Sequence, residues 1–256
     1  MIFLEASALV NWWDLDPRLA AERAFATPLV PEQTAAYPAA MTGAADTDTR
    51  TAFAAECRSI VRTLERVPGD AWDRPALGQW TLHELVAHLL RAVTRVPTYL
   101  DQAVESTPDP PAMPDRVGYF QMDLAGQAPA IAERARLDAA ALAIAGVADT
   151  FAHATGEALE RIRTLPADHV MQTLRGPMLL EEYLATRVLE LVVHHMDVRS
   201  ALDLPPESDP VAGRLTMGIL EGLLGGPRPR NLGRTRFILA ATGRIDVVDP
   251  RFPVLR

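Results

Sequence analysis

The chain has 256 residues, of which 48% are hydrophobic and 23% are charged, a balance typical of a soluble globular protein. No stretch approaches the roughly 18 uncharged apolar residues that a membrane-spanning helix requires. A formal net charge of -8 argues against nucleic acid as the main partner, because phosphate binding requires clustered cations. The single cysteine, Cys57, excludes an internal disulfide, so we expect a protein of the reducing cytoplasm.

The first part of the chain changes from irregular to helical sequence. Residues 1–40 contain four prolines and little periodicity, which indicates an irregular N-terminal extension. Apolar residues near helical spacing predict a first helix over residues 48–67. A turn-rich segment follows, and Thr81 with Glu84 three residues later forms a capping box that begins a second helix, which runs to about residue 102.

The rest of the chain continues this helical pattern after a proline-rich loop. Alanine-rich sequence over residues 124–164 predicts a third helix, either long or broken once. Residues 169–177 favour a short strand or an extended connection. A fourth helix is predicted over 179–202 and a fifth over 208–224, and the tail ends with one more apolar element, strand or short helix, that begins near residue 237.

Four long helices with short or proline-rich connections predict a mainly α fold, a four-helix bundle. We expect three parts in the chain. An extension over residues 1–40 precedes the bundle, which we place at 41–204, and a short C-terminal appendage of helix and tail occupies 205–256.

The fourth helix carries the most informative polar residues. Glu190 and His194 are four residues apart, so they share one face of a helix whose neighbouring positions are almost all apolar. A carboxylate buried there costs several kcal/mol unless a partner or a metal ion satisfies it. The Glu190 carboxylate therefore requires a partner inside the protein.

His88 offers such a group, because it lies in an apolar stretch of the second helix. His88, Glu190 and His194 together form a three-ligand set for a divalent metal, and three protein ligands leave one position open, as in catalytic zinc sites. Asp197, about one turn beyond His194, is the candidate fourth ligand for a closed structural site. The residues alone also allow a satisfied core histidine and a hydrogen-bonded pair at i and i+4.

Other polar residues are weaker candidates. His83 and His88 are five residues apart, about 140 degrees around a helix, so they lack the spacing of a zinc protease motif. Glu84 competes as a ligand, but its capping role is simpler, and we expect His195 to be structural or to support a ligand. Four arginines near the C-terminus favour a solvated basic patch over an anion site, and they are Arg228, Arg230, Arg234 and Arg236.

Two blocks of sequence resemble the mycothiol-dependent maleylpyruvate isomerase family. The first is Trp-Asp-Arg-Pro at 72–75 with Gly-Gln-Trp-Thr-Leu-His-Glu-Leu-Val-Ala-His-Leu at 78–89, and the second is Tyr-Leu-Ala-Thr-Arg-Val-Leu-Glu-Leu-Val-Val-His-His-Met-Asp at 183–197. The resemblance, over about residues 48–202, implies a DinB-like four-helix bundle. It also implies a zinc ion held by a His of the second helix and by a Glu and a His of the fourth, which fall on His88, Glu190 and His194.

The resemblance further implies a zinc-dependent isomerase or S-transferase that takes mycothiol as a thiol cosubstrate and acts on a small electrophile. Zinc is a preference over nickel, iron or manganese, since His and carboxylate ligands suit several of these ions. The segment after the fourth helix does not align with the second domain of the isomerases, which leaves the substrate open. The alternative is a non-catalytic metal or small-molecule binding module with a closed site.

Overall fold

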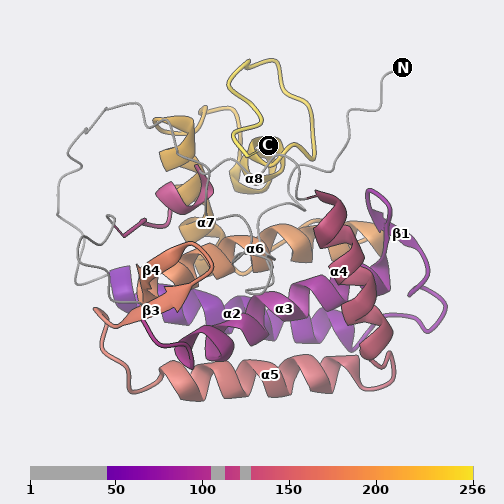
Figure 1. The fold of residues 1–256 in the computed structure, drawn as a ribbon. Coiled ribbons are helices and arrows are strands. Elements are labelled where there is room, and N and C mark those ends of the chain that lie inside the picture. Colours follow the sequence, from indigo (N-terminus) through magenta and orange to yellow (C-terminus); the bar gives the residue numbers. More distant parts are fainter. Residues whose placement is uncertain (1–44, 105–112, 122–127, 256) are drawn as a thin grey trace.

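The structure is a computed structural model that describes residues 45–104, 113–121 and 128–255 (Figure 1). The expected extension over residues 1–40 lies outside this range. Within it the fold is mainly α, a DinB-like helical bundle as the sequence predicts. No helix among the described residues is long and apolar enough to cross a membrane.

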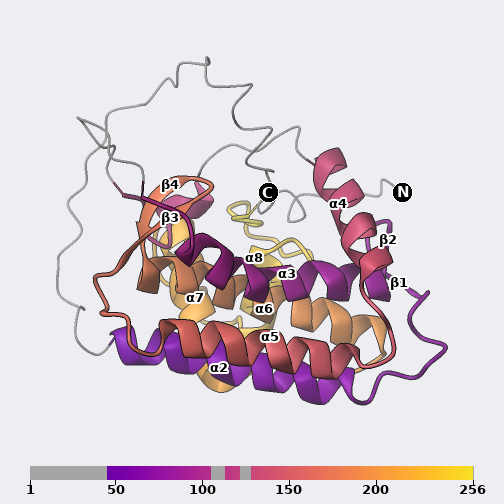
Figure 2. The same cartoon turned by 60° about the horizontal axis from the view of Figure 1, so that its bottom comes forward.

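Four helices form the bundle: α2 (Ala45–Leu64), α3 (Leu82–Leu100), α5 (Val147–Ile162) and α6 (Leu180–Ala201). Helix α6 packs against α2 and α3, and α5 covers the same two helices, as Figure 2 shows. Arg50 near the start of α2 pairs with Glu181 at the start of α6, so these two helices run in one direction. Helix α5 runs in the other direction, because Arg50 also donates to the carbonyl oxygen of Ile162 at the end of α5 at 3.0 Å. Helix α3 runs with α5, because Asp101 and Arg161 pair where both of them end.

The predicted start of the second helix is confirmed in detail. The Thr81 hydroxyl accepts a hydrogen bond from the backbone N–H of Glu84, and the Glu84 carboxylate accepts one from the backbone N–H of Thr81. This reciprocal pair satisfies two backbone donors that the first turn leaves unpaired. Glu84 is therefore used as a cap.

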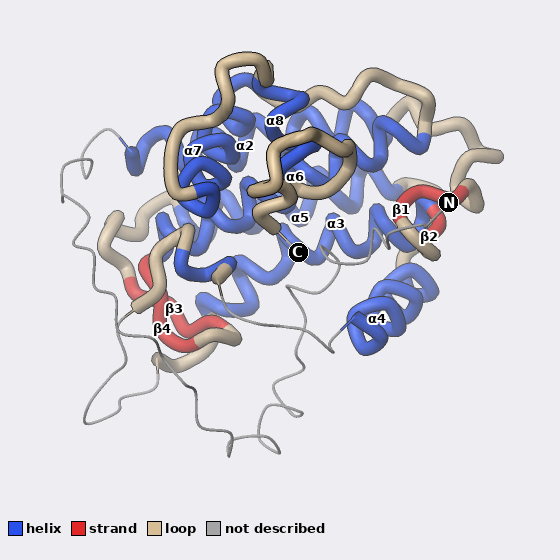
Figure 3. Tube along the Cα trace, turned by 90° about the horizontal axis from the view of Figure 1, so that it is seen from above, coloured by secondary structure: helices blue, strands red, loops and turns tan. Residues whose placement is uncertain are grey.

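Two short antiparallel hairpins lie at opposite ends of the bundle (Figure 3). Strands β1 (Pro75–Leu77) and β2 (Trp80–Thr81) occupy the turn-rich segment before α3. Strands β3 (Val170–Thr173) and β4 (Gly176–Leu179) form the second hairpin, which leads directly into α6. The sequence predicted one short strand or an extended connection over residues 169–177, and the structure shows two strands paired as a hairpin.

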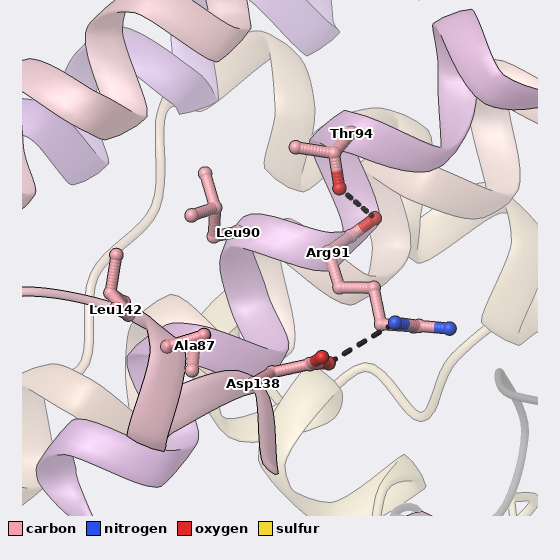
Figure 4. Close-up of a pocket in the computed structure, with 7 residues that line it drawn as sticks. Ala87, Leu90, Arg91, Thr94, Asp138 and Leu142 are labelled. Atoms are coloured by element: carbon pink, nitrogen blue, oxygen red, sulfur yellow. Dashed lines mark hydrogen bonds and ion pairs between the residues drawn. The ribbon is translucent and has the colours of Figure 1, made fainter. Parts of the chain in front are cut away.

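The alanine-rich stretch is broken once, and only its second half joins the bundle. Gly146 adopts a left-handed φ of 79 degrees and begins α5 after the break. Helix α4 (Ala128–Ala141) instead lies outside, against α3. It is held by an ion pair of 3.1 Å between Arg91 and Asp138, beside a shallow cavity of about 240 Å³ (Figure 4). Its described buried residues are alanines, Ala135 and Ala139, which are too small to anchor a bundle helix.

The C-terminal segment adds two helices on the α6 side of the bundle, above it in Figure 1. The Asp209 side chain caps α7 (Pro210–Leu224), which agrees with the fifth helix predicted over 208–224, and Gly225 ends it in a left-handed conformation. Helix α7 packs against both α2 and α6. The apolar element of the tail is the short helix α8 (Arg234–Ala241). A 3-10 turn, η2 (Gly118–Phe120), lies between α3 and α4.

Helix α6 is the centre of the molecule. Apart from Glu182, every residue from Leu180 to Val198 is buried, charged residues included. A helix that buries all its faces must lie inside the fold, and its polar side chains must find partners within the protein. The site described next is built on these polar residues.

Candidate metal centre

Three side chains from α3 and α6 converge inside the bundle. The Nε2 atoms of His88 and His194 lie 3.9 Å and 3.4 Å from the same carboxylate oxygen, Oε2 of Glu190. The candidate ligand atoms of the three residues all lie within 4.8 Å of one another, and each residue is at most 4% exposed. The set that the sequence singled out is thus brought together in space.

His88 is held in place by an aromatic neighbour. Its ring lies 4.8 Å from the Trp80 ring, centroid to centroid, and 5.2 Å from the ring of His194. Trp80 belongs to β2, immediately before the cap of α3, so the hairpin and the capping box together fix where this histidine lies. Trp80 is 2% exposed and excludes water from that side of the site.

Asp197 and Arg244 fix the orientation of the His194 ring through Nδ1, the nitrogen that does not face Glu190. The Nδ1–H of His194 donates to Asp197 Oδ2 at 3.0 Å, since an ionised carboxylate can only accept. Arg244 donates to both carboxylate oxygens of Asp197, at 3.1 Å and 2.7 Å. This arrangement directs Nε2 of His194 toward Glu190, and a carboxylate that accepts from the second ring nitrogen is the usual support of a metal-binding histidine.

The electrostatics of the cluster favour positive charge at its centre. Burial lowers the pKa of His194, but the carboxylates of Asp197 and Glu190 outweigh burial and raise that pKa to about 9. Burial likewise raises the pKa of Glu190, yet the two histidines hold it below its ordinary value. Arg244 and His194 keep the pKa of Asp197 well below its ordinary value against the effect of burial.

The donor set fits a divalent cation. Nε2 of His194 is buried and forms no hydrogen bond with a described residue, although Glu190 Oε2 lies 3.4 Å from it. A buried polar atom without a partner requires an explanation, and a metal ion between the two histidines and the carboxylate supplies one. Imidazole nitrogen and carboxylate oxygen are common zinc ligands.

The competing ligands that the sequence left open are used elsewhere. Glu84 caps α3, and His83 contacts the carbonyl oxygen of Leu142 at 3.0 Å. Asp197 does not belong to the group of candidate ligand atoms, because its carboxylate lies on the other nitrogen of His194. In the described part of the chain, Asp197 therefore does not close the site.

His195 faces α2, and its contacts fit the structural one of the two roles that the sequence left open. Its Nδ1 lies 2.6 Å from Glu56 Oε1, and its Nε2 lies 2.8 Å from the Thr63 hydroxyl. Glu56 is fully buried and its second oxygen accepts from the backbone N–H of Asp209. The sequence did not single out Glu56, since nothing in the pattern of α2 identifies its partners on α6 and α7.

Arg187 is a second buried charge near the site that the residue pattern alone did not single out. It lies three residues before Glu190 on α6 and is 2% exposed. Its guanidinium lies 4.6 Å from the centre of the Tyr183 ring and donates to the Tyr119 hydroxyl at 3.3 Å. The attraction between a cation and the faces of aromatic rings offsets part of the free-energy cost of burying the charge.

Comparison with known proteins identifies the family. The chain matches the family described as Mycothiol maleylpyruvate isomerase N-terminal domain over residues 53–199. This chain belongs to that family. Neither the curated proteins nor the solved structures that were compared gave a match.

The range matched by the mycothiol maleylpyruvate isomerase N-terminal domain includes His88, Glu190 and His194. The resemblance found in the sequence is thereby confirmed. Membership connects the chain with mycothiol-related isomerases, and a cluster able to hold a metal ion lies within the matched range. The match ends before α7 and α8. Arg244, which binds the Asp197 carboxylate that contacts His194, therefore lies beyond the matched domain.

Proposed function

We propose that this protein is a zinc-dependent enzyme that uses mycothiol, as an isomerase or S-transferase acting on a small electrophile. The observation that carries the proposal is the convergence of His88, Glu190 and His194 around one buried point. A set of three protein ligands is typical of catalytic zinc, which keeps a further position for water or substrate. A bound zinc ion would supply the positive charge that converts a thiol into a thiolate at neutral pH.

The chain's own residues prepare the site for this chemistry. Asp197 holds the proton on Nδ1 of His194, so that Nε2 presents its lone pair to the metal. Trp80 and the apolar neighbours of α6 exclude water, which strengthens the attraction between Glu190 and a cation. The nucleophile must come from outside, since Cys57, the single cysteine, is fully buried and burial raises the pKa of its thiol to about 12.

Metal content tests the first half of the proposal. We expect about one zinc per chain, measured by elemental mass spectrometry on the purified protein, and its loss in His194→Ala. His153→Ala is the matched control, because His153 is exposed on α5 and should leave the metal in place. If the unaltered protein, purified and then incubated with zinc, holds none, the proposal is wrong.

Thiol consumption tests the second half. The zinc-loaded protein is mixed with mycothiol and a panel of small electrophiles, and the loss of free thiol is compared with that for His194→Ala. Faster loss with the unaltered protein supports an S-transferase, and isomerised product with no net loss supports an isomerase. A protein that holds zinc but is inert toward the whole panel would favour the alternative, a non-catalytic binding module.

A further inference from the structure

A second cavity lies at the end of the bundle where α2 and α6 end. In Figure 1 the β1–β2 hairpin lies at this end. Its volume is about 530 Å³, in the range of small-molecule sites. Four arginines line it, Arg62 and Arg66 from α2, Arg74 from the turn before β1, and Arg199 from α6. Among the described residues of the lining, Glu207 is the one carboxylate, so four positive charges accompany one negative charge in a chain of net charge -8.

Two of these arginines are not used by the fold. Arg199 donates to the carbonyl oxygen of Pro205 at 2.7 Å and to Glu207 at 3.1 Å. Such contacts are common for an arginine near a helix C-terminus. The side chains of Arg62 and Arg66 make no hydrogen bond or ion pair with any residue that the structure describes. Stabilisation of the helix ends therefore does not account for them.

The rest of the lining is suited to a phosphoryl group with an apolar substituent. Ser59 also lines the cavity, and hydroxyl and guanidinium donors together are common at phosphate sites. Leu202 and Leu204 supply the apolar part of the lining, and Leu204 is 42% exposed, a large fraction for a leucine. A phosphate monoester that carries a small apolar group would cover this leucine and neutralise the arginines.

We propose that this cavity is a second ligand site, separate from the metal centre, that binds a small phosphorylated molecule. The phosphoryl group would lie between Arg62 and Arg66, whose forked donors match its oxygens, and the apolar group would lie on Leu204. Thr63 connects the cavity to the interior, because its hydroxyl contacts Nε2 of His195, the residue after the metal-centre residue His194. The site does not depend on the enzymatic proposal above.

Isothermal titration calorimetry with phenyl phosphate at low ionic strength tests the proposal on the full chain. We expect saturable binding of one molecule per chain that weakens as salt is added. In the double variant Arg62→Ala/Arg66→Ala the affinity should fall about tenfold or more, because two charge-assisted hydrogen bonds are lost. Both side chains are exposed, so the variant should keep the circular dichroism spectrum of the parent.

Two matched variants make the result specific. Arg58→Ala removes an exposed arginine from α2 about one turn before Arg62, outside the cavity, and should bind phenyl phosphate like the parent. His194→Ala should also bind it, which excludes capture of the phosphate by the metal centre. Equal affinity in the double variant and the parent, or binding of an oligonucleotide without binding of phenyl phosphate, would overturn the proposal.

Discussion

His194 and His195 are adjacent in sequence, but they serve different parts of the molecule. Successive residues of a helix point about 100 degrees apart, so one ring reaches α3 and Glu190 while the other reaches α2. His194 lies 3.4 Å from Glu190, whereas His195 lies 2.6 Å from Glu56. The direction of each ring on α6 therefore decides which histidine can bind a metal.

Cys57 allows a prediction at the scale of a single residue. It is fully buried in α2, and burial raises the pKa of its thiol to about 12, so the reactive thiolate is scarce at neutral pH. We expect iodoacetamide to leave the folded protein unmodified at about pH 8 and to label it completely in urea. Mass spectrometry of the intact chain measures both states, and rapid labelling of the folded protein would contradict a buried thiol.

Residues whose partners lie close along a helix were predictable, and those with distant partners were not. Glu190 and His194 share a face by their spacing alone, and the apolar sequence around them indicates burial. His88 could be joined to them because it breaks a similar apolar pattern. Glu56 and Arg244 contact α6 across 139 and 47 positions of the chain, and no periodicity in the sequence encodes such pairs.

At the scale of helices and strands, local signals gave correct boundaries where caps or glycines fix them. The capping box at Thr81 is decided by neighbouring backbone groups, so the sequence located the start of α3. The predicted end of the fifth helix at residue 224 likewise agrees with α7, which ends before the left-handed Gly225. The alanine-rich stretch was ambiguous, because alanine favours a helix without saying which face is buried. Only tertiary packing separates α4, outside the bundle, from α5 within it.

Glu56 on α2 contacts both α6 and the cap of α7, so its replacement tests how α7 is held in the fold. Its carboxylate lies 2.6 Å from His195 on α6 and accepts from the backbone N–H of Asp209, the cap of α7, at 2.7 Å. Glu56→Ala should lower the free energy of unfolding by about 3 kcal/mol, since it leaves buried polar groups without a partner. Urea unfolding followed by circular dichroism gives this value.

Glu157→Ala is the control for this measurement. Glu157 also lies beside a histidine, His153 at 3.5 Å, but both side chains are more than half exposed on α5. Water replaces the interaction of such a surface pair, so the free energy of unfolding should hardly change. Equal destabilisation by the two substitutions would show that the Glu56 network does not hold α7.

At the scale of the whole molecule, the C-terminal segment is part of the candidate metal centre. The family match ends at residue 199, yet Arg244 lies beyond α8 and returns to Asp197. The bundle supplies the candidate ligands, and the segment after it fixes the orientation of one of them. This dependence explains why the sequence could place the candidate ligands but could not assign a role to the tail.

Replacement of Arg244 tests this dependence on the proposed zinc site. Without the guanidinium, the Asp197 carboxylate loses its partner and holds Nδ1 of His194 less firmly, so Arg244→Gln should weaken zinc binding about tenfold. Competition with a chromophoric chelator measures the affinity directly. Arg251→Gln is the control, because Arg251 pairs with Asp249 on the surface.

A double variant separates this route from a general loosening of the tail. If Arg244 acts through Asp197, then Arg244→Gln should add little to the loss of zinc affinity that Asp197→Asn causes by itself, because both changes break the same chain of contacts to His194. Additive losses would mean that Arg244 supports the site by another path. Unchanged affinity in both single variants would mean that the tail only packs against the bundle.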